Sequence, residues 1–486
     1  IRLEREDLIY PGTGKSADFR FLPTGNGWSH GKAGYSDNPI LRAQRLAVAR
    51  DEVVVDDSPA VSRLELRRSA GEHLDVGAGL DDFDCDEKEL PHLLEHLLFS
   101  GIDATGEGGL EERMQALGGE WNAFTSNADT TFVIEAPAKN QRKVLDLLLA
   151  LLTQTRIDDN AINAAKRVVE REDGGHYTRL RRFLDRQDLG HTASNQLAVE
   201  LGLKCPQRAE VDHLTQEQLE KVRQAWYAPN NMTLIIVGEL DKLLPAYLER
   251  TWGALEPVEP SEHRPLPDIS TSAAHERTLT RGFIGDGAKL HWMVPEPVLD
   301  DQYDQTFDIL KDYLDWALYR QIRLNHGLSY GPWAEREVFG GVGFMSLNAD
   351  LDRDNVDEAI QVLEDLKADL LKNGLDPDTF ARIKQAAIAH QAWAVQGNSA
   401  MADYYWSALS DYQDGRFANP ARELQGVTLE TANKAMRELM LQPGYLRIEK
   451  PLISDDQVLW VAAGGVGLVL LMLIGWRVYH RKSARQ

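Results

Sequence analysis

The segment HLLEH at residues 92–96 constrains the fold of this chain more than any other stretch. On an α-helix, His92 and His96 lie one turn apart, so both imidazoles leave the same face. Two such rings can bind one divalent ion at about 2.0–2.1 Å, and Glu95 beside them can take a proton from water at that ion. The segment therefore predicts a helix with one chemically active face.

The other face of this helix is apolar, which fits burial in a core. Four leucines form a stripe at helical spacing, namely Leu93, Leu94, Leu97 and Leu98. A leucine-rich core helix that merely contains two histidines would have the same residue pattern. A third ligand is needed to decide, because catalytic zinc takes three protein ligands and keeps one position for water.

Glu172 is the candidate for that third ligand. It lies in a run that is typical of a helix from Asp158 onward, and it follows His96 by 76 residues. An HxxEH segment followed by a glutamate at this distance resembles the pitrilysin-like inverzincin zinc metallopeptidases. This is the family of insulin-degrading enzyme and the mitochondrial processing peptidase.

Three other segments carry the same resemblance, which covers residues 51–452. They are GGEWNAFT at 118–125, WYAPNNM at 226–232 and RLNHGLSY at 323–330. The chain also departs from the family in two places. Ala165 occupies the position, seven before Glu172, where family members often carry a second acidic residue. Residues 71–90 are longer and more acidic than the family pattern.

The resemblance implies one Zn²⁺ per chain, bound by His92, His96 and Glu172. Glu95 would be the catalytic base that deprotonates the attacking water. The metal would lower the pKa of that water and polarise the peptide carbonyl.

The resemblance also implies that a peptide substrate adds as a strand to an exposed sheet edge. That edge consists of Asn122, Ala123, Phe124 and Thr125. The Asn122 side chain would bond the substrate backbone, and Phe124 would line a pocket. Ordinary core packing of Phe124 is an equal alternative, which the sequence alternation does not decide.

Arg323 and Tyr330 form a pair that, by the same resemblance, contacts substrate or stabilises the oxyanion from a facing domain. A guanidinium and a phenol are suitable donors for developing negative charge. Because this chain keeps both the metal motif and the Arg/Tyr pair, we expect a homodimer. A heterodimer with a metal-free relative is the alternative.

The length of 486 residues and the net charge of −23 limit the classes of partner. Such a chain can form several domains with substantial cores. Its negative charge argues against nucleic acid, whose phosphates it would repel. An acidic chamber would instead attract basic peptides, although an ordinary solvated surface has the same composition. The two cysteines, Cys85 and Cys205, are too few for a disulfide scaffold, and their pairing stays open.

We predict an α+β chain of two homologous domains, each an antiparallel sheet packed with helices, plus a C-terminal transmembrane helix. The predicted parts are an irregular arm at 1–50, a catalytic domain at 51–255, a Pro-rich linker at 256–270, a second domain at 271–452, a membrane helix at 457–478 and a basic tail at 479–486. Residues 159–166 resemble 377–384, which indicates a repeat. In that alignment the metal ligands and the base fall on Leu310, Leu314, His390 and Tyr313, so the second domain repeats the scaffold without the metal site.

Residues 458–476 carry no charged side chain and approach the roughly 20 residues that span a bilayer. Asp455 and Asp456 precede this run, whereas Arg477 and Arg481 follow it. The positive-inside rule then directs the tail to the cytoplasm and the body to the periplasmic side of a bacterial inner membrane. A buried core helix is the alternative. The topology requires export, so we expect a signal segment ahead of residue 1.

These features favour a membrane-anchored zinc endopeptidase that cleaves peptides or unfolded segments. One rival is a non-catalytic membrane-anchored scaffold, or a subunit of a heterodimeric peptidase, that only captures peptides. A second rival is a dedicated maturation protease for one exported partner. Zinc content and chelator-sensitive cleavage of an unstructured peptide separate the first rival from the enzyme. Cleavage of one partner, with generic peptides left intact, would indicate the second.

Overall fold

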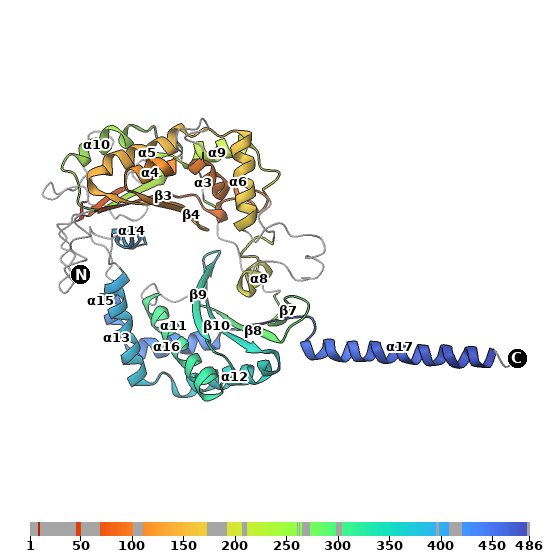
Figure 1. Ribbon diagram of the computed structural model, residues 1–486. Coiled ribbons are helices and arrows are strands. Elements are labelled where there is room, and N and C mark those ends of the chain that lie inside the picture. The colour runs from red at the N-terminus through yellow and green to blue at the C-terminus, as the bar shows by residue number, and fades with distance from the viewer. Residues whose placement is uncertain are drawn as a thin grey trace. The chain divides into compact units, whose positions relative to one another are not determined.

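The computed structural model divides into two compact units, and each is built from three stretches of chain (Figure 1). It describes residues 8–9, 45–49, 69–100, 110–172, 192–206, 211–259, 261, 263–264, 273–297, 304–394, 398–407 and 420–483. Unit 1 consists of Ile1–His176, Gln207–Leu266 and Gln385–Gly426, and unit 2 of Tyr177–Pro206, Pro267–Lys384 and Val427–Gln486. The prediction of a mixed helix-and-sheet chain is confirmed.

A six-stranded sheet in the order β1-β2-β6-β3-β5-β4 forms the middle of unit 1. Its strands are β1 (Leu8–Ile9), β2 (Arg45–Ala49), β3 (Ser69–Val76), β4 (Glu120–Thr125), β5 (Thr130–Pro137) and β6 (Met232–Gly238). β6 is apolar apart from Thr233, and every one of its residues is buried, as suits a strand covered on both faces. β1 and β2 lie within the predicted irregular arm at 1–50. The other residues of that arm fall outside the described part of the chain.

Helices cover both faces of this sheet (Figure 1). They are η1 (Leu80–Asp82), α3 (Leu90–Ser100), α4 (Leu110–Ala116), η2 (Ala138–Asn140), α5 (Gln141–Gln154), α6 (Asp159–Glu172), α9 (Gln216–Trp226), η3 (Pro229–Asn231), α10 (Leu244–Arg250), η4 (Trp252–Ala254), α14 (Asn398–Ser407) and α15 (Pro420–Gly426). α3, α5, α6 and α9 share one apolar core with the sheet. α14 contacts β3, β5 and β6 from the other face.

Unit 2 contains a five-stranded sheet in the order β7-β11-β8-β10-β9. Its strands are β7 (Glu276–Thr280), β8 (Gly287–Pro295), β9 (Trp333–Phe339), β10 (Val342–Asp352) and β11 (Tyr445–Lys450). Its helices are α8 (Ala193–Glu200), α11 (Asp304–Leu318), the π-helical η6 (Tyr319–Asn325), η7 (Arg353–Asn355), α12 (Val356–Asn373), α16 (Leu429–Leu441) and α17 (Asp455–Ser483), while α13 (Pro377–Ala394) starts in unit 2 and ends in unit 1.

The two sheets share one topology. The order β2-β6-β3-β5-β4 in unit 1 has the same succession along the chain as β7-β11-β8-β10-β9 in unit 2. Each sheet also holds one parallel pair, β2 with β6 and β7 with β11, so neither is purely antiparallel as the sequence analysis expects. The units interleave across the predicted linker at 256–270, because α8 belongs to unit 2 whereas α14 and α15 belong to unit 1.

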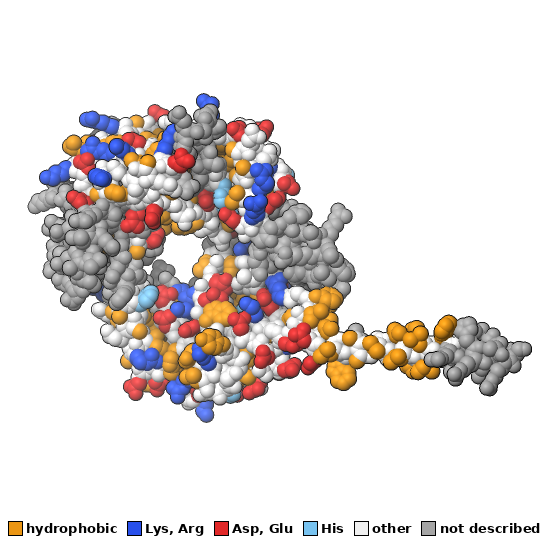
Figure 2. Space-filling view, viewed as in Figure 1, with side chains coloured by type: hydrophobic (Ala, Val, Ile, Leu, Met, Phe, Trp, Pro, Cys, Tyr) orange, Lys and Arg blue, Asp and Glu red, His pale blue; other side chains and the backbone are white. Residues whose placement is uncertain are grey.

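Two further features bear on where the chain resides. By length and composition, α17 is apolar enough to cross a membrane over Asp455–Ile474. Figure 2 shows its apolar side chains exposed along the helix. Neither Cys85 nor Cys205 is a free thiol, since both are disulfide-bonded.

Candidate metal centre

Helix α3 positions its two histidines by burying its opposite face. The four leucines of the predicted stripe are fully buried, and they belong to the core that α3 shares with α5 and α6. His92 and His96 are half-buried. α3 also packs directly against α6, whose last residue is Glu172. Apolar packing of one helix on another therefore brings together residues that are far apart in sequence.

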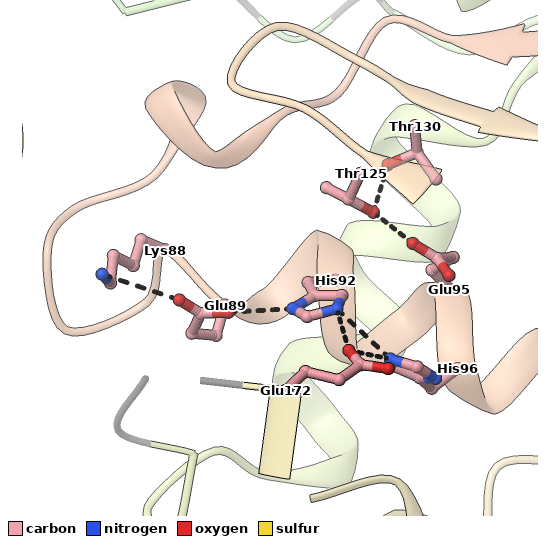
Figure 3. A network of polar contacts seen from close by, with 8 residues as sticks. All are labelled: Lys88, Glu89, His92, Glu95, His96, Thr125, Thr130 and Glu172. Atoms are coloured by element: carbon pink, nitrogen blue, oxygen red, sulfur yellow. Dashed lines mark hydrogen bonds and ion pairs between the residues drawn. The ribbon is translucent and has the colours of Figure 1, made fainter. Parts of the chain in front are cut away.

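The predicted ligand atoms converge (Figure 3). Glu172 Oε2 lies 3.1 Å from His92 Nε2 and 3.1 Å from His96 Nε2, and the two Nε2 atoms lie 3.2 Å apart. Two ligands of a tetrahedral zinc ion are about 3.3 Å apart if each lies about 2.0–2.1 Å from the metal. Two imidazole nitrogens and one carboxylate oxygen at this separation fit zinc and leave a fourth position open.

Glu89 is a member of this cluster that the sequence analysis misses. It is buried, and its Oε2 lies 3.1 Å from His92 Nδ1 while Lys88 Nζ is 3.6 Å from its Oε1 (Figure 3). With Nδ1–H donating to Glu89, the Nε2 lone pair of His92 faces the other ligands. Glu89 lies immediately before α3 and three residues before His92, and this i, i+3 spacing across the first turn is the signal that could have identified it.

Charges around His92 shift the pKa values of both partners. Burial tends to raise the pKa of Glu89, but the hydrogen bond with His92 and the charge of Lys88 outweigh it, so this pKa is lowered. Burial tends to lower the pKa of His92, yet the bond and charge of Glu89 and the charges of Glu95 and Glu172 raise it above its ordinary value. The carboxylates around His92 therefore favour a positive charge on its ring.

Glu89→Ala is expected to lower zinc affinity about 10- to 100-fold without removing a ligand, because His92 would lose the carboxylate that fixes its ring. Competition with a fluorescent chelator measures this affinity. Glu87→Ala is the matched control, since Glu87 accepts a hydrogen bond from Gln218 instead. An affinity unchanged in Glu89→Ala would contradict the orienting role.

Glu95 is positioned for proton transfer. Its side chain is only 6% exposed, and Thr125 Oγ1 donates a 2.8 Å hydrogen bond to its Oε2. Thr125 also lies 3.3 Å from the hydroxyl of Thr130, which in turn donates to the carbonyl of Ala78. Burial raises the pKa of Glu95, although the Thr125 bond and the two imidazoles oppose this shift. A carboxylate with a raised pKa is a better base.

The predicted substrate edge is β4, which has β5 as its partner in the described part of the sheet. The Ala123 N–H donates 3.0 Å to Asn122 Oδ1, so this amide is satisfied locally by the preceding side chain. Phe124 is 46% exposed, which argues against the alternative of ordinary core packing. Thr125 lies on the opposite face of the strand and contacts Glu95.

Arg323 and Tyr330 lie together in unit 2. The Arg323 guanidinium lies 4.3 Å from the centre of the Tyr330 ring, and Tyr330 is 85% exposed. Arg323 comes from the π-helical turn η6, a type of turn that is frequent at functional sites. The metal cluster belongs to unit 1, so the action of this pair on the same substrate stays a prediction.

The positions that the sequence repeat aligns with the metal site have a different character. Leu310, Tyr313 and Leu314 are buried in α11, and His390 lies on α13. Within the described residues, the group of His92, His96 and Glu172 is the one arrangement of His, Cys, Asp and Glu side chains suited to a metal ion.

Known proteins share both sequence and fold with this chain. Residues 70–206 match the family model described as Insulinase (Peptidase family M16), and residues 213–387 match the Peptidase M16 inactive domain. The uncharacterized zinc protease YmxG of Bacillus subtilis is 19% identical over 411 residues, which cover 82% of this chain and 96% of that protein. The probable mitochondrial-processing peptidase subunit beta of Arabidopsis thaliana is 30% identical, over 28% of this chain and 27% of its own length.

Two solved structures illustrate the shared fold. A protease from Helicobacter pylori superposes with a TM-score of 0.66 at 14% identity, covering 87% of this chain and 99% of that one. The periplasmic protease PqqL from Escherichia coli superposes with a TM-score of 0.62 at 17% identity, covering 83% of this chain and 46% of that longer one.

Proposed function

Because this chain belongs to peptidase family M16, the insulinase family, we propose that it is a zinc-dependent endopeptidase. The observation that carries this proposal is the convergence of His92, His96 and Glu172 beside the buried carboxylate of Glu95. A relative over most of the chain length bears the name zinc protease, which supports the same metal.

In the proposed mechanism, His92, His96 and Glu172 would hold zinc, which when bound would act as a Lewis acid that lowers the pKa of water and polarises the scissile carbonyl. Glu95 takes the proton of the attacking water. Thr125 holds Oε2 of this carboxylate by a hydrogen bond, which leaves Oε1 to receive the proton. Glu95 then returns the proton to the amine that leaves.

The substrate in this proposal is an extended peptide that pairs with the open edge of β4. Its backbone would compete with the Asn122 side chain for the Ala123 N–H, so the Asn122 amide would turn to bond the peptide instead. The exposed ring of Phe124 would pack against a substrate side chain. Arg323 and Tyr330 would supply donors to the oxyanion, within a homodimer.

Purified chain is expected to contain one zinc per chain and to cut an unstructured peptide into fragments that mass spectrometry identifies. A chelator should abolish both the metal and the cleavage, and added zinc should restore both. Stoichiometric zinc without any cleavage would favour the non-catalytic scaffold. Turnover that persists after zinc removal would contradict the mechanism.

We also propose a single-pass location in a bacterial inner membrane, with the body on the periplasmic side. The apolar helix α17 and the disulfide-bonded state of both cysteines support it, since disulfides persist in oxidising compartments. Protein that is taken from membranes and denatured without reduction is therefore expected not to react with maleimide. After reduction, each chain should bind two equivalents of maleimide. Two reactive thiols before reduction would contradict export.

A further inference from the structure

The turn between β7 and β8 is bonded to the segment that leads into α17. Four backbone hydrogen bonds join them: Leu452 N to Gly282 O, Ile453 N to Phe283 O, Gly285 N to Ile453 O and Arg281 N to Lys450 O. Ile284 and Ile453 also form a bridge, and the Asp455 N–H donates to Asp286. The first turn of α17 is therefore fixed to unit 2 and does not hang on a free linker.

Three large apolar side chains are exposed at this junction. Phe283 is 49% exposed, Ile284 51% and Leu452 52%. Figure 2 shows apolar side chains gathered where α17 leaves unit 2. Gly282, with φ +81°, allows the tight turn that presents Phe283 and Ile284. Exposed apolar groups that are adjacent and fixed in place mark an interaction surface more strongly than isolated ones.

The position of these side chains relative to the start of α17 indicates which surface would cover them. Ile453, which bridges Ile284, lies two residues before α17 begins at Asp455. Val458, the first residue of the uncharged run, lies three residues further on, or about 4.5 Å of helix rise. The headgroup layer on each side of a bilayer is about 5–8 Å thick. A helix inserted from Val458 onward would place the start of α17 in this layer, and the bonded turn would hold Phe283 and Ile284 beside it, where exposed apolar side chains can insert.

We propose that Phe283, Ile284 and Leu452 form a membrane-contact collar that inserts into the bilayer interface beside α17. The collar fixes the tilt of unit 2 relative to the membrane. With α17 as the single anchor, unit 2 could tilt about the helix, but a rigid junction and a second point of insertion prevent this motion. This inference rests on the proposed membrane anchoring of α17 and adds the surface of the body that touches lipid.

The test uses the full chain, unreduced, in phosphatidylcholine–phosphatidylglycerol vesicles that contain spin-labelled lipids. Each variant carries one introduced cysteine with an environment-sensitive fluorophore: Phe283→Cys or Ile284→Cys in the collar, Leu468→Cys in α17, and Leu441→Cys as an exposed control at the end of α16. The native cysteines do not react, since neither is a free thiol. We expect headgroup spin labels to remove most of the emission at 283 and 284, deep-chain spin labels to quench 468, and neither to quench 441.

The outcomes separate the collar from the anchor. Quenching at 468 but not at 283 or 284 would overturn the collar and keep the anchor. An unquenched 468 would overturn the anchor, and the collar with it. Quenching at 283 by a second, spin-labelled copy of the chain in place of lipid would also overturn the collar, because it would identify this surface as a dimer contact.

Discussion

Glu95→Gln is expected to bind zinc as tightly as the parent chain and to cleave peptides about 10²- to 10⁴-fold more slowly, the usual contribution of a general base. The amide has the shape of the carboxylate and can still accept the hydrogen bond from Thr125, so the fold around it should persist. It cannot accept a proton from water. Zinc content and peptide turnover, measured on the same preparation, test both halves of this expectation.

Glu112→Gln is the matched control for this variant. Glu112 is an exposed glutamate on α4, in the same unit, and is not one of the three candidate ligands. Its substitution removes an equal charge and should leave turnover unchanged. Normal turnover by Glu95→Gln would exclude Glu95 as the base. Loss of zinc from the same variant would instead indicate that its charge helps to hold the metal.

The grouping of the candidate ligands was partly predictable, because helical periodicity fixes which side chains of one helix share a face. His92 and His96 follow from their i, i+4 spacing alone, and the buried leucines of α3 follow from the same period. Glu172 does not, because no local rule brings α6 against α3 across 76 residues. Only the family spacing identified Glu172 as a candidate ligand.

Other parts of the fold could not be predicted from their local sequence. β3 lies in the middle of the sheet of unit 1, yet half of its sequence SAGEHLDV is polar, and all but its first two residues fall in the long acidic stretch at 71–90. Only Leu74 and Val76 give it an apolar alternation. The parallel pairs β2/β6 and β7/β11 join strands that are far apart in the sequence of each unit. No short hairpin turn connects them, so no local sequence signal predicts the pairing.

The interleaving of the units was equally invisible in the sequence. A Pro-rich stretch indicates a break in regular structure, and residues 256–270 show one, but a chain can cross such a break and return. α14 illustrates this: its Trp406 Nε1 donates 3.1 Å to Asp129 in the β4–β5 turn of unit 1. Asp129 in turn accepts from Ser126, beside Thr125. A helix from the second half of the sequence thus supports the turn that follows Thr125, the partner of Glu95.

His96→Ala is expected to abolish zinc binding at concentrations that saturate the parent chain, and to abolish cleavage with it. Only His92 and Glu172 would remain as ligands. The variant would lack the His96 Nε2 atom, which lies 3.2 Å from His92 Nε2 and 3.1 Å from Glu172 Oε2. Elemental analysis after gel filtration measures the metal. Thermal unfolding gives a readout that does not depend on activity, because zinc at 100 times its Kd stabilises the native state by about 2.7 kcal/mol.

The melting temperature of the parent chain should therefore rise with added zinc, whereas that of His96→Ala should not. His390→Ala is the matched control, since the sequence repeat aligns this α13 residue with Glu172 and it lies outside the metal cluster. It should bind zinc and gain stability as the parent does. Stoichiometric zinc in His96→Ala would mean that the ion is held elsewhere, and the assignment of these three side chains as its ligands would then be wrong. Loss of zinc response in both variants would point to general unfolding, which circular dichroism of the metal-free proteins distinguishes from loss of one ligand.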